Sequence, residues 1–256
     1  MIFSLFKRLF MSRFEKIRRE FTANVSHELK TPLQSISGAA ELLKSGVVKE
    51  EDREKFIDII IAESQRMNRI IGDIIVLSKL DSDVWMHEKE DVDLVKLTRD
   101  SVESLRNTAE KSSIKLTLST PLKSERTVRG SRHYLEALIS NLVDNAVHYN
   151  RPGGIVDVKL QYGEDYLTLT VADTGIGIEE EHQERIFERF YRVDKGRSRN
   201  SGGTGLGLSI VKHGMAYHHA RVTLDSQVDV GTQVGLWFPH TAPSDGSLCA
   251  VPLDNS

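Results

Sequence analysis

The stretch Phe21-Thr-Ala-Asn-Val-Ser-His27-Glu-Leu-Lys-Thr-Pro32 decides how the rest of the chain is interpreted. Apolar side chains recur every four residues from Phe21 to Leu29, which predicts a helix with one buried stripe. His27 lies two residues from the stripe, about 200° around the helix, and is therefore expected to face solvent. Pro32 has no N–H to donate to the preceding turn, so one helical hydrogen bond is missing beside the histidine.

The neighbours of His27 give this stretch chemical meaning. Glu28 follows directly and supplies a carboxylate that can accept a proton, and Thr31 supplies a hydroxyl one turn further on. An outward imidazole with both groups in reach is typical of a nucleophilic site. The residues alone leave a solvated surface histidine as the alternative.

Composition narrows the class of protein. The chain has 256 residues, 39% of them hydrophobic and 28% charged, which allows one large domain or two modest ones. Its formal net charge of -3 provides no basic field, so no nucleic-acid partner is expected. The single cysteine, Cys249, excludes a disulfide framework and a cysteine-built metal site.

Residues 1–11 form an apolar segment interrupted by Lys7 and Arg8. The segment is shorter than the roughly 20 apolar residues of a spanning helix, and it lacks the cleavage site of a signal peptide. Three interpretations stay open: the cytoplasmic end of a transmembrane helix, a short interfacial membrane tether, or the start of a coiled coil.

Residues 12–81 have a helical repeat throughout, and Gly46 is a plausible left-handed cap between two antiparallel helices. The apolar faces are too wide for two helices to enclose, which predicts a four-helix bundle in a homodimer. Packing of the hairpin on its own C-terminal domain is the alternative. The expected buried positions are Phe14, Ile17, Phe21, Val25, Leu29, Ile36, Ala40 and Leu43, then Phe56, Ile60, Met67, Ile70, Ile74 and Leu77, with Glu63 as the one break.

A polar stretch without periodicity, residues 82–91, is expected to be a linker. Residues 92–240 then mix helical and alternating patterns, and residues 241–256 are expected to be a disordered tail. Helices are predicted at 94–110, 132–150, 179–190 and 204–218, strands at 114–119, 155–162, 166–172, 222–226 and 232–238, and a mobile lid at 194–203.

The predicted helix 132–150 carries Asn141, Asn145 and His148 on one face, at spacings of four and three. Amide oxygens can complete the octahedral shell of a Mg²⁺ ion that phosphates already hold. Polar residues at a helix end are the alternative interpretation.

Two glycine-containing turns follow. Asp173-Thr-Gly-Ile-Gly177 ends a strand, where a carboxylate can accept a hydrogen bond from an exocyclic amine such as that of adenine. Gly202-Gly-Thr-Gly-Leu-Gly-Leu208 leads into a helix, whose first N–H groups form a phosphate cradle. No lysine follows, so this is not a P-loop. Between the turns, Arg192 could neutralise charge on a transferring phosphate.

In this order and spacing, these motifs make the chain from about Arg13 to Pro239 similar to the two-domain core of bacterial two-component sensor histidine kinases, closest to the phosphate-sensor type. The matching segments are an H box at 26–32, an N box at 141–150, a first glycine box at 173–177, an F box at 187–194 and a second glycine box at 203–207.

The resemblance implies an α+β fold: a helical dimerisation hairpin followed by an α/β-sandwich ATPase domain of the gyrase and histidine-kinase type. It implies that ATP phosphorylates His27, with Glu28 as acid–base partner, and that Asn145 holds Mg²⁺ with help from Asn141. Asp173 would recognise adenine. The other residues expected around the nucleotide are His148, Tyr149, Gly175, Gly177, Gly203, Thr204, Gly205, Leu206 and Gly207, with Arg192 at the transferring phosphate.

The same resemblance implies a place in signalling. The phosphoryl group would pass to an aspartate of a response regulator receiver domain, and Thr31 would orient water for the reverse, phosphatase reaction. The protein would act on the cytoplasmic side of the bacterial membrane. The family usually has lysine or arginine at the position of His148, so ATP binding here is expected to weaken as rising pH removes the charge of this histidine.

Gyrase-type relatives of the ATP fold carry a water-activating glutamate where this chain has Asn141, and an amide cannot act as a base. Two rival functions remain at the level of the sequence. One is a stand-alone ATP-driven clamp of the gyrase or mismatch-repair kind, and the other is a dimer scaffold that binds nucleotide without transfer.

Overall fold

A computed structural model describes residues 2–81, 89–120, 127–193 and 203–239, and side chains from Arg19 onward. The chain divides into two compact units, Met1–Ile74 with Gly202–Thr204, and Ile75–Ser201 with Gly205–Ser256. Most of the predicted linker, nearly all of the predicted lid and the predicted tail lie outside the described residues.

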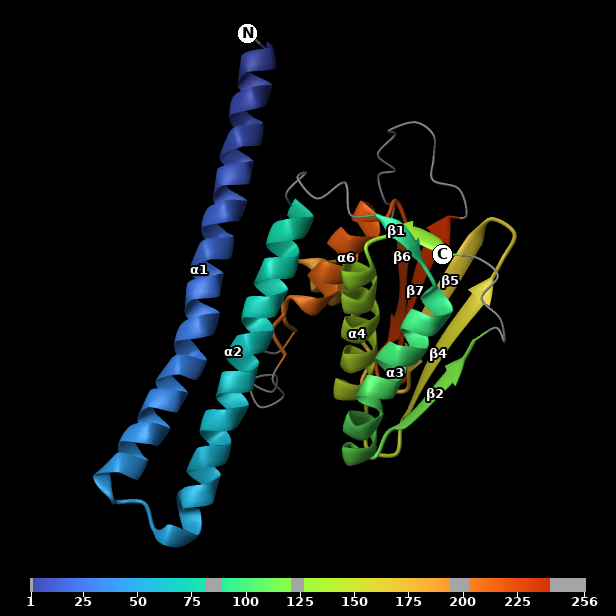
Figure 1. The fold of residues 1–256 in the computed structure, drawn as a ribbon. Coiled ribbons are helices and arrows are strands. Elements are labelled where there is room, and N and C mark those ends of the chain that lie inside the picture. The colour runs from blue at the N-terminus through green and yellow to red at the C-terminus, as the bar shows by residue number, and fades with distance from the viewer. Residues whose placement is uncertain (1, 82–88, 121–126, 194–202, 240–256) are drawn as a thin grey trace. The chain divides into compact units, whose positions relative to one another are not determined.

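The first unit is built on a helical hairpin. Helix α1 (Ile2–Ser45) is followed by a short 3₁₀ turn, η1 (Glu50–Asp52), and by α2 (Arg53–Asp81), whose last residues belong to the second unit (Figure 1). Helix α1 continues through Pro32, because one missing hydrogen bond does not stop a helix whose apolar stripe is packed. Gly46, at a φ of +72°, follows the end of α1 and confirms the predicted cap. No helix of the described residues is both long and apolar enough to cross a membrane.

Phe14 and Ile17 lie outside the residues whose side chains are described. From Phe21 to Leu43 the predicted stripe of α1 is half-buried in the single chain, except at Ala40. Ala39 is 5% exposed, whereas Ala40 is exposed to solvent. A helix has 3.6 residues per turn, so the stripe alternates steps of four and three, and the step after Ile36 is three. Several large apolar side chains of the hairpin remain exposed in the single chain: Leu33, Leu42, Ile57, Ile59, Ile61 and Ile71.

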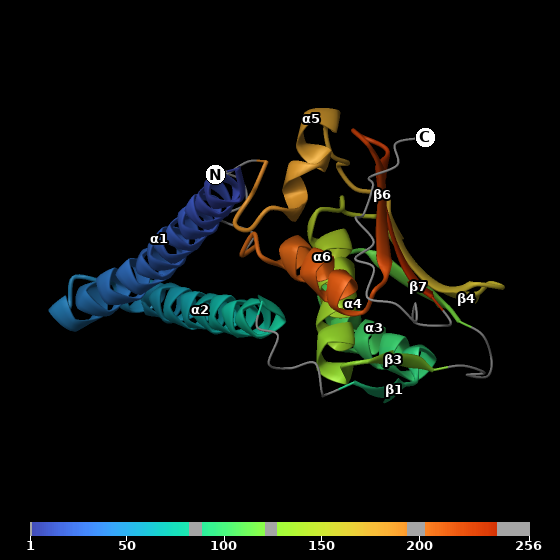
Figure 2. The same ribbon diagram turned by 90° about the horizontal axis from the view of Figure 1, so that it is seen from above.

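The second unit contains a five-stranded mixed sheet in the order β2-β4-β5-β7-β6, in which only the β2–β4 pair is parallel. Figure 2 shows helices α3, α4 and α6 on one face of this sheet. The strands are β2 (Lys115–Ser119), β4 (Ile155–Tyr162), β5 (Tyr166–Asp173), β6 (Arg221–Gln227) and β7 (Gly231–Pro239); the helices are α3 (Leu94–Lys111), α4 (Arg132–His148) and α6 (Gly207–Tyr217).

The core lies between the helices and the sheet. Alternate residues of β4 and β5 are buried, as their period-two pattern predicts. The apolar face of α4 is buried as expected, which turns its opposite face away from the core. The buried residues are Val156, Val158 and Leu160 of β4, Leu167, Leu169 and Val171 of β5, and Leu135, Leu138, Leu142 and Ala146 of α4.

Two parts of this unit differ from the prediction. Glu90 and Asp91, which the sequence placed in the linker, belong to strand β1 (Glu90–Val92), which pairs with β3 (Val128–Gly130). A three-residue polar strand has no periodicity to reveal it, because it forms through pairing with a distant partner. The predicted helix 179–190 is two short turns, α5 (Glu180–Gln183) and η3 (Arg185–Phe187). Gln183 here bonds the carbonyls of Ile178 and Ser226, which fixes an irregular path.

His218 ties the end of α6 to the segment between β3 and α4. It is 6% exposed; its Nε2 accepts from the backbone N–H of Ser131 at 3.1 Å, and its Nδ1 lies 2.6 Å from the carbonyl oxygen of Gly214. These partners require the neutral ring with its proton on Nδ1. Burial lowers the pKa of His218 to about 4, although the Gly214 carbonyl favours the charged form; Lys89 and His219 lower it further.

We expect acid to destabilise this domain through His218. The ring binds a proton more weakly in the folded chain than in the unfolded chain, so stability falls as the pH is lowered from about 6.5 to about 4, by up to about 3 kcal/mol. Urea unfolding of wild type and His218→Gln at pH 7, 5.5 and 4.5 measures this contribution. The variant should show the shallower pH dependence, and His133→Gln, which removes an exposed histidine, corrects for the loss of one titratable group. Equal slopes in wild type and His218→Gln would contradict the assignment.

Candidate functional site

His27 is exposed on α1, as the helical pattern predicts. Thr31 lies one turn further along the same helix, and its hydroxyl donates to the backbone carbonyl of His27 at 3.3 Å. The imidazole and the hydroxyl therefore belong to one accessible part of the helix surface. Both predicted side chains are where a macromolecular partner can reach them.

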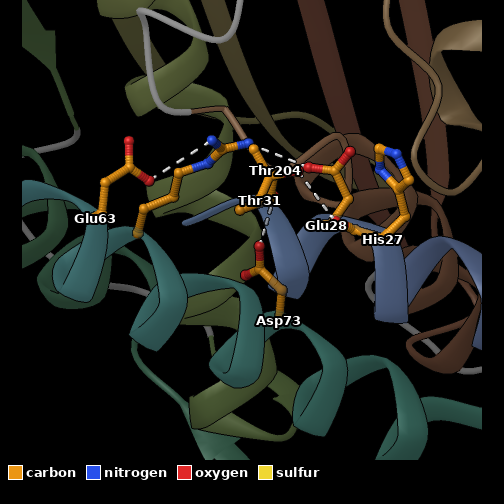
Figure 3. A network of polar contacts seen from close by, with 7 residues as sticks. His27, Glu28, Thr31, Glu63, Asp73 and Thr204 are labelled. Carbon is orange, nitrogen blue, oxygen red and sulfur yellow. Dashed lines mark hydrogen bonds and ion pairs between the residues drawn. The ribbon is translucent and has the colours of Figure 1, made fainter. Parts of the chain in front are cut away.

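Glu28 has a partner that sequence reasoning missed. Its Oε2 accepts a hydrogen bond from Nη2 of Arg66 on α2 at 3.1 Å (Figure 3). Nη1 of Arg66 lies 3.9 Å from Oε2 of Glu63, one turn earlier on α2. The signal in the sequence is that Arg66 lies one turn after Glu63, the residue that breaks the apolar stripe of the second helix. The predicted acid–base residue is thus held from the opposite helix of the hairpin.

Thr204, predicted to lie against nucleotide, clusters with the first unit. Its hydroxyl donates to Oδ2 of Asp73 on α2 at 2.7 Å (Figure 3). Gly203 beside it is half-buried. In this conformation the Thr204 hydroxyl is engaged by a carboxylate of the helical unit. Its contact with nucleotide therefore stays a prediction.

The polar face of α4 meets the second glycine box within the other unit. The amide Nδ2 of Asn141 donates to the carbonyl of Ala137 at 2.8 Å, and its Oδ1 lies so close to Gly207 that an added Cβ would be 2.5 Å away. Asn145 is half-buried, and its side chain makes no hydrogen bond to the described residues. Asn145 therefore has an amide oxygen to offer a ligand, whereas Asn141 is already packed against the start of α6.

Asp173 ends β5 and is held by backbone donors. Its Oδ1 accepts from the N–H groups of Gly175 at 2.8 Å and Thr232 at 3.2 Å. Burial raises the pKa of the Asp173 carboxyl, and the two N–H groups oppose that shift by favouring the charged form. Both bonds use one oxygen, so the second carboxylate oxygen remains as an acceptor for a ligand amine.

The first glycine box passes close to the backbone that follows α4. A Cβ at Gly175 would lie 2.4 Å from the carbonyl oxygen of Tyr149, and that oxygen accepts the N–H of Ile176 at 3.1 Å. Gly177 has a φ of +69°, and a Cβ there would lie 2.0 Å from the carbonyl oxygen of Gln227. Both glycines are therefore required by close backbone contact, as well as being expected beside a planar ring.

The F box packs on the second glycine box. The N–H of Phe190 donates to the carbonyl of Gly205 at 2.8 Å, and Gly205 itself has a φ of +70°. A Cβ at Gly205 would lie 3.0 Å from Cα of Phe190 and 3.3 Å from Cγ of Arg192, so these segments pack tightly against the glycine. Leu206, the residue before α6, is fully buried and anchors the segment.

Arg192 also lies close to the end of α4. Burial raises the pKa of the Tyr149 hydroxyl, and the positive charge of Arg192 partly opposes this shift. His148 is half-buried, and its ring meets that of Tyr149 edge to face, 5.0 Å apart. The predicted nucleotide residues from Asn141 to Gly177 and from Gly205 to Gly207 therefore converge in one unit, together with Arg192.

The donor set fits a nucleotide with its divalent cation. A carboxylate oxygen can accept a hydrogen bond from the amine of a base, and a half-buried amide oxygen can coordinate a hard cation such as Mg²⁺. A positively charged side chain beside them can bind phosphate. The three parts are Asp173, Asn145 and Arg192. Position 141 has no carboxylate that could activate water. It is occupied by Asn141, whose amide packs against Gly207.

Comparison with known proteins finds two family matches. Residues 17–83 match the family described as "His Kinase A (phospho-acceptor) domain". Residues 130–242 match "Histidine kinase-, DNA gyrase B-, and HSP90-like ATPase". The first match contains the exposed histidine, and the second contains the converging polar and glycine residues.

Individual relatives agree with these matches. Sensor-like histidine kinase SenX3 of Mycolicibacterium smegmatis is 39% identical over 229 residues, which are 90% of this chain and 59% of the relative. The chain thus spans less than two thirds of that protein. The mycobacterial sensor histidine kinase MprB has a solved structure that is 30% identical with a TM-score of 0.50, covering 59% of this chain and 97% of that one.

A solved structure described as histidine kinase ThkA in complex with response regulator protein TrrA superposes with a TM-score of 0.69. It covers 90% of this chain and 64% of the other at 23% identity, which supports the fold. The α+β fold expected from the sequence, a helical hairpin followed by an ATPase-type domain, is confirmed.

Gly177 and Gly153 offer a matched test of the first glycine box. Both have a positive φ, but a Cβ at Gly153 meets nothing within 4 Å, whereas one at Gly177 meets backbone. We expect Gly153→Ala to cost about 1 kcal/mol in urea unfolding, and Gly177→Ala to cost about 1–3 kcal/mol more. Gly177→Ala should also weaken binding of a fluorescent ATP analogue at least about tenfold, or about 1.4 kcal/mol. Equal effects of both substitutions would show that the contact with Gln227 does not shape the box.

Proposed function

Because the chain belongs to the sensor histidine kinase family, we propose that it transfers the γ-phosphoryl group of ATP to its own His27 and then to an aspartate of a response regulator receiver domain. The observation that carries the proposal is the exposed imidazole of His27 beside the anchored carboxylate of Glu28, in a chain that also has an ATPase-type domain. The amide of Asn141 cannot act as a base that activates water, which favours transfer of the phosphoryl group to His27 over hydrolysis of ATP.

The chemical step assigns a role to each group near His27. One ring nitrogen uses its lone pair to form the N–P bond while the O–P bond to ADP breaks. The proton on the other ring nitrogen passes to Glu28, so that the phosphorylated ring becomes neutral. Transfer to the receiver then forms an O–P bond to aspartate and breaks the N–P bond, and the ring regains a proton.

We assign nucleotide binding to residues of the ATPase-type domain. We assign adenine recognition to Asp173, with Gly175 and Gly177 allowing close approach of the ring. Asn145 would hold Mg²⁺, with Asn141 acting mainly through its contact with Gly207. Mg²⁺ would supply charge neutralisation at the phosphates. Phosphate contacts are assigned to Arg192, His148 and the second glycine box, including Gly203, Thr204, Gly205 and Gly207.

The partners follow from the same assignment. The receiver domain should dock near His27, where the reacting nitrogen is exposed. A homodimer would cover the apolar side chains that the hairpin leaves exposed, such as Leu33 and Ile61. We place the activity on the cytoplasmic side of the bacterial membrane, where receiver domains occur. We propose domain limits of 12–81 for the hairpin and 90–240 for the ATPase-type domain, because strand β1 begins at Glu90.

His27→Gln should abolish labelling by γ-labelled ATP. The substitution removes the nucleophile but leaves the nucleotide residues untouched, so affinity for a fluorescent ATP analogue should stay within about twofold of wild type. Acid-labile, base-stable label on the wild-type protein identifies phosphohistidine. Equal labelling of wild type and His27→Gln would contradict the assignment of His27 as the phosphorylated residue. Loss of nucleotide binding in the variant would contradict the assignment of nucleotide binding to residues other than His27.

Thr31→Ala should keep autophosphorylation and lose dephosphorylation of the phosphorylated receiver. The hydroxyl lies one turn from His27 on the hairpin, where we propose that it orients the attacking water. Loss of one positioned polar group should slow the phosphatase reaction about 100-fold. Thr31→Ser keeps the hydroxyl and should retain most of the activity. A Thr31→Ala protein that dephosphorylates its receiver as fast as wild type would remove this role.

A further inference from the structure

Arg66 is a buried charge on α2 of the hairpin unit. Its side chain is 6% exposed and lies on the same side of α2 as Ile70, one turn further along the helix. Removing a guanidinium from water costs several kcal/mol unless its partners compensate. A buried ion pair adds little stability over an apolar pair of similar volume. Stability alone therefore gives little reason for an arginine at this position.

The partners of Arg66 compensate this burial unequally. Glu28 on α1 gives the one good hydrogen bond, at 3.1 Å. Glu63 approaches only to 3.9 Å, beyond hydrogen-bonding distance, and Nε of Arg66 finds no partner among the described residues. Of the five N–H donors of the Arg66 guanidinium, only one at Nη2 makes a hydrogen bond of good geometry to the described residues, and its acceptor is Glu28. The contact fixes Glu28 more than it satisfies the arginine.

Glu28 lies between this contact and His27. Figure 3 shows the dashed bond on one oxygen of the Glu28 carboxylate and the imidazole of His27 on the other side of that carboxylate. The Glu28 side chain is 25% exposed, so without an anchor it would sample several rotamers in water. Anchoring through Oε2 restricts the side chain, and Oε1 takes no part in this bond.

We propose that Arg66 is a positioning residue for the phosphotransfer reaction: it holds Glu28 by one carboxylate oxygen so that the other accepts the ring proton of His27. This inference rests on the proposed function, because it assigns the origin of the Glu28 geometry in that reaction. The guanidinium does not touch the reacting atoms. Its effect on rate is exerted only through Glu28.

The test compares autophosphorylation rates of wild type, Arg66→Met, Arg66→Lys, Glu28→Gln and the double variant Glu28→Gln/Arg66→Met in the full chain. Arg66→Met should lower the rate at saturating ATP about 10- to 100-fold, with the KM for ATP unchanged within about twofold. Arg66→Lys should recover part of the loss, because it restores a cation at the end of a flexible chain. In the Glu28→Gln background, Arg66→Met should cost less than about twofold.

Glu63→Gln is the matched control. It alters the other carboxylate near Arg66, which makes no hydrogen bond to it, so labelling should stay within about twofold of wild type. Rates are divided by the folded fraction, measured by circular dichroism at the assay temperature, so that a loss of stability does not count as a loss of rate. Arg66→Lys supplies the result if Arg66→Met does not fold, since its rate must fall between wild type and Glu28→Gln.

The outcomes separate this inference from the function on which it rests. If wild type labels on His27 but Arg66→Met and Arg66→Lys label at the wild-type rate per folded molecule, the positioning role is wrong and the kinase assignment stands. Equal losses from Arg66→Met with and without Glu28 would also overturn it, because Arg66 would then act independently of Glu28. If wild type does not label at all, the proposed function itself fails.

Discussion

The apolar contact between α1 and α2 is the constraint on which the proposed phosphoacceptor site at His27 depends. Pro32 and Ala39 of α1 and Ile70 of α2 are buried in the hairpin unit. Because these residues fix the buried side of α1, the helical period places His27 on the solvent-exposed side. The same packing brings Glu28 within reach of Arg66, 38 residues later in the chain. The exposure of His27 and the restraint of the Glu28 carboxylate thus both follow from the packing of α1 against α2.

In the ATPase-type domain, the division of α4 into an apolar and a polar face determines which of its side chains are available to a ligand. Leu135, Leu138 and Leu142 commit one face to the core, and this presents Asn145 on the other. Glycine is needed around that face because a Cβ would meet backbone at Gly175 and Gly177 and the side chain of Asn141 at Gly207. The domain therefore combines a rigid helix with turns that only glycine can form. This arrangement offers a ligand the amide group of Asn145 and the carboxylate of Asp173.

Much of this could be predicted because it is periodic. The long helices, the β4–β5 hairpin and the exposure of His27 follow from repeats of 3.6 or two residues. Strand β1 and the turns between Glu180 and Phe187 could not be predicted in this way, since distant partners such as β3 and Ser226 define them. Arg66 was missed for the same reason: a charged residue in an apolar stripe is understood only when Glu28 is seen beside it. The bond from Thr204 to Asp73 is equally invisible in the pattern.

The central claim is that the phosphoryl group of ATP goes to His27 rather than to water. A single-turnover reaction with γ-labelled ATP tests it most directly, by following ADP, inorganic phosphate and the label on the peptide that contains His27. The account predicts that early ADP formation is matched by base-stable label on that peptide, with inorganic phosphate appearing only later. ADP formed together with an equal amount of inorganic phosphate, and no label on His27, would contradict it.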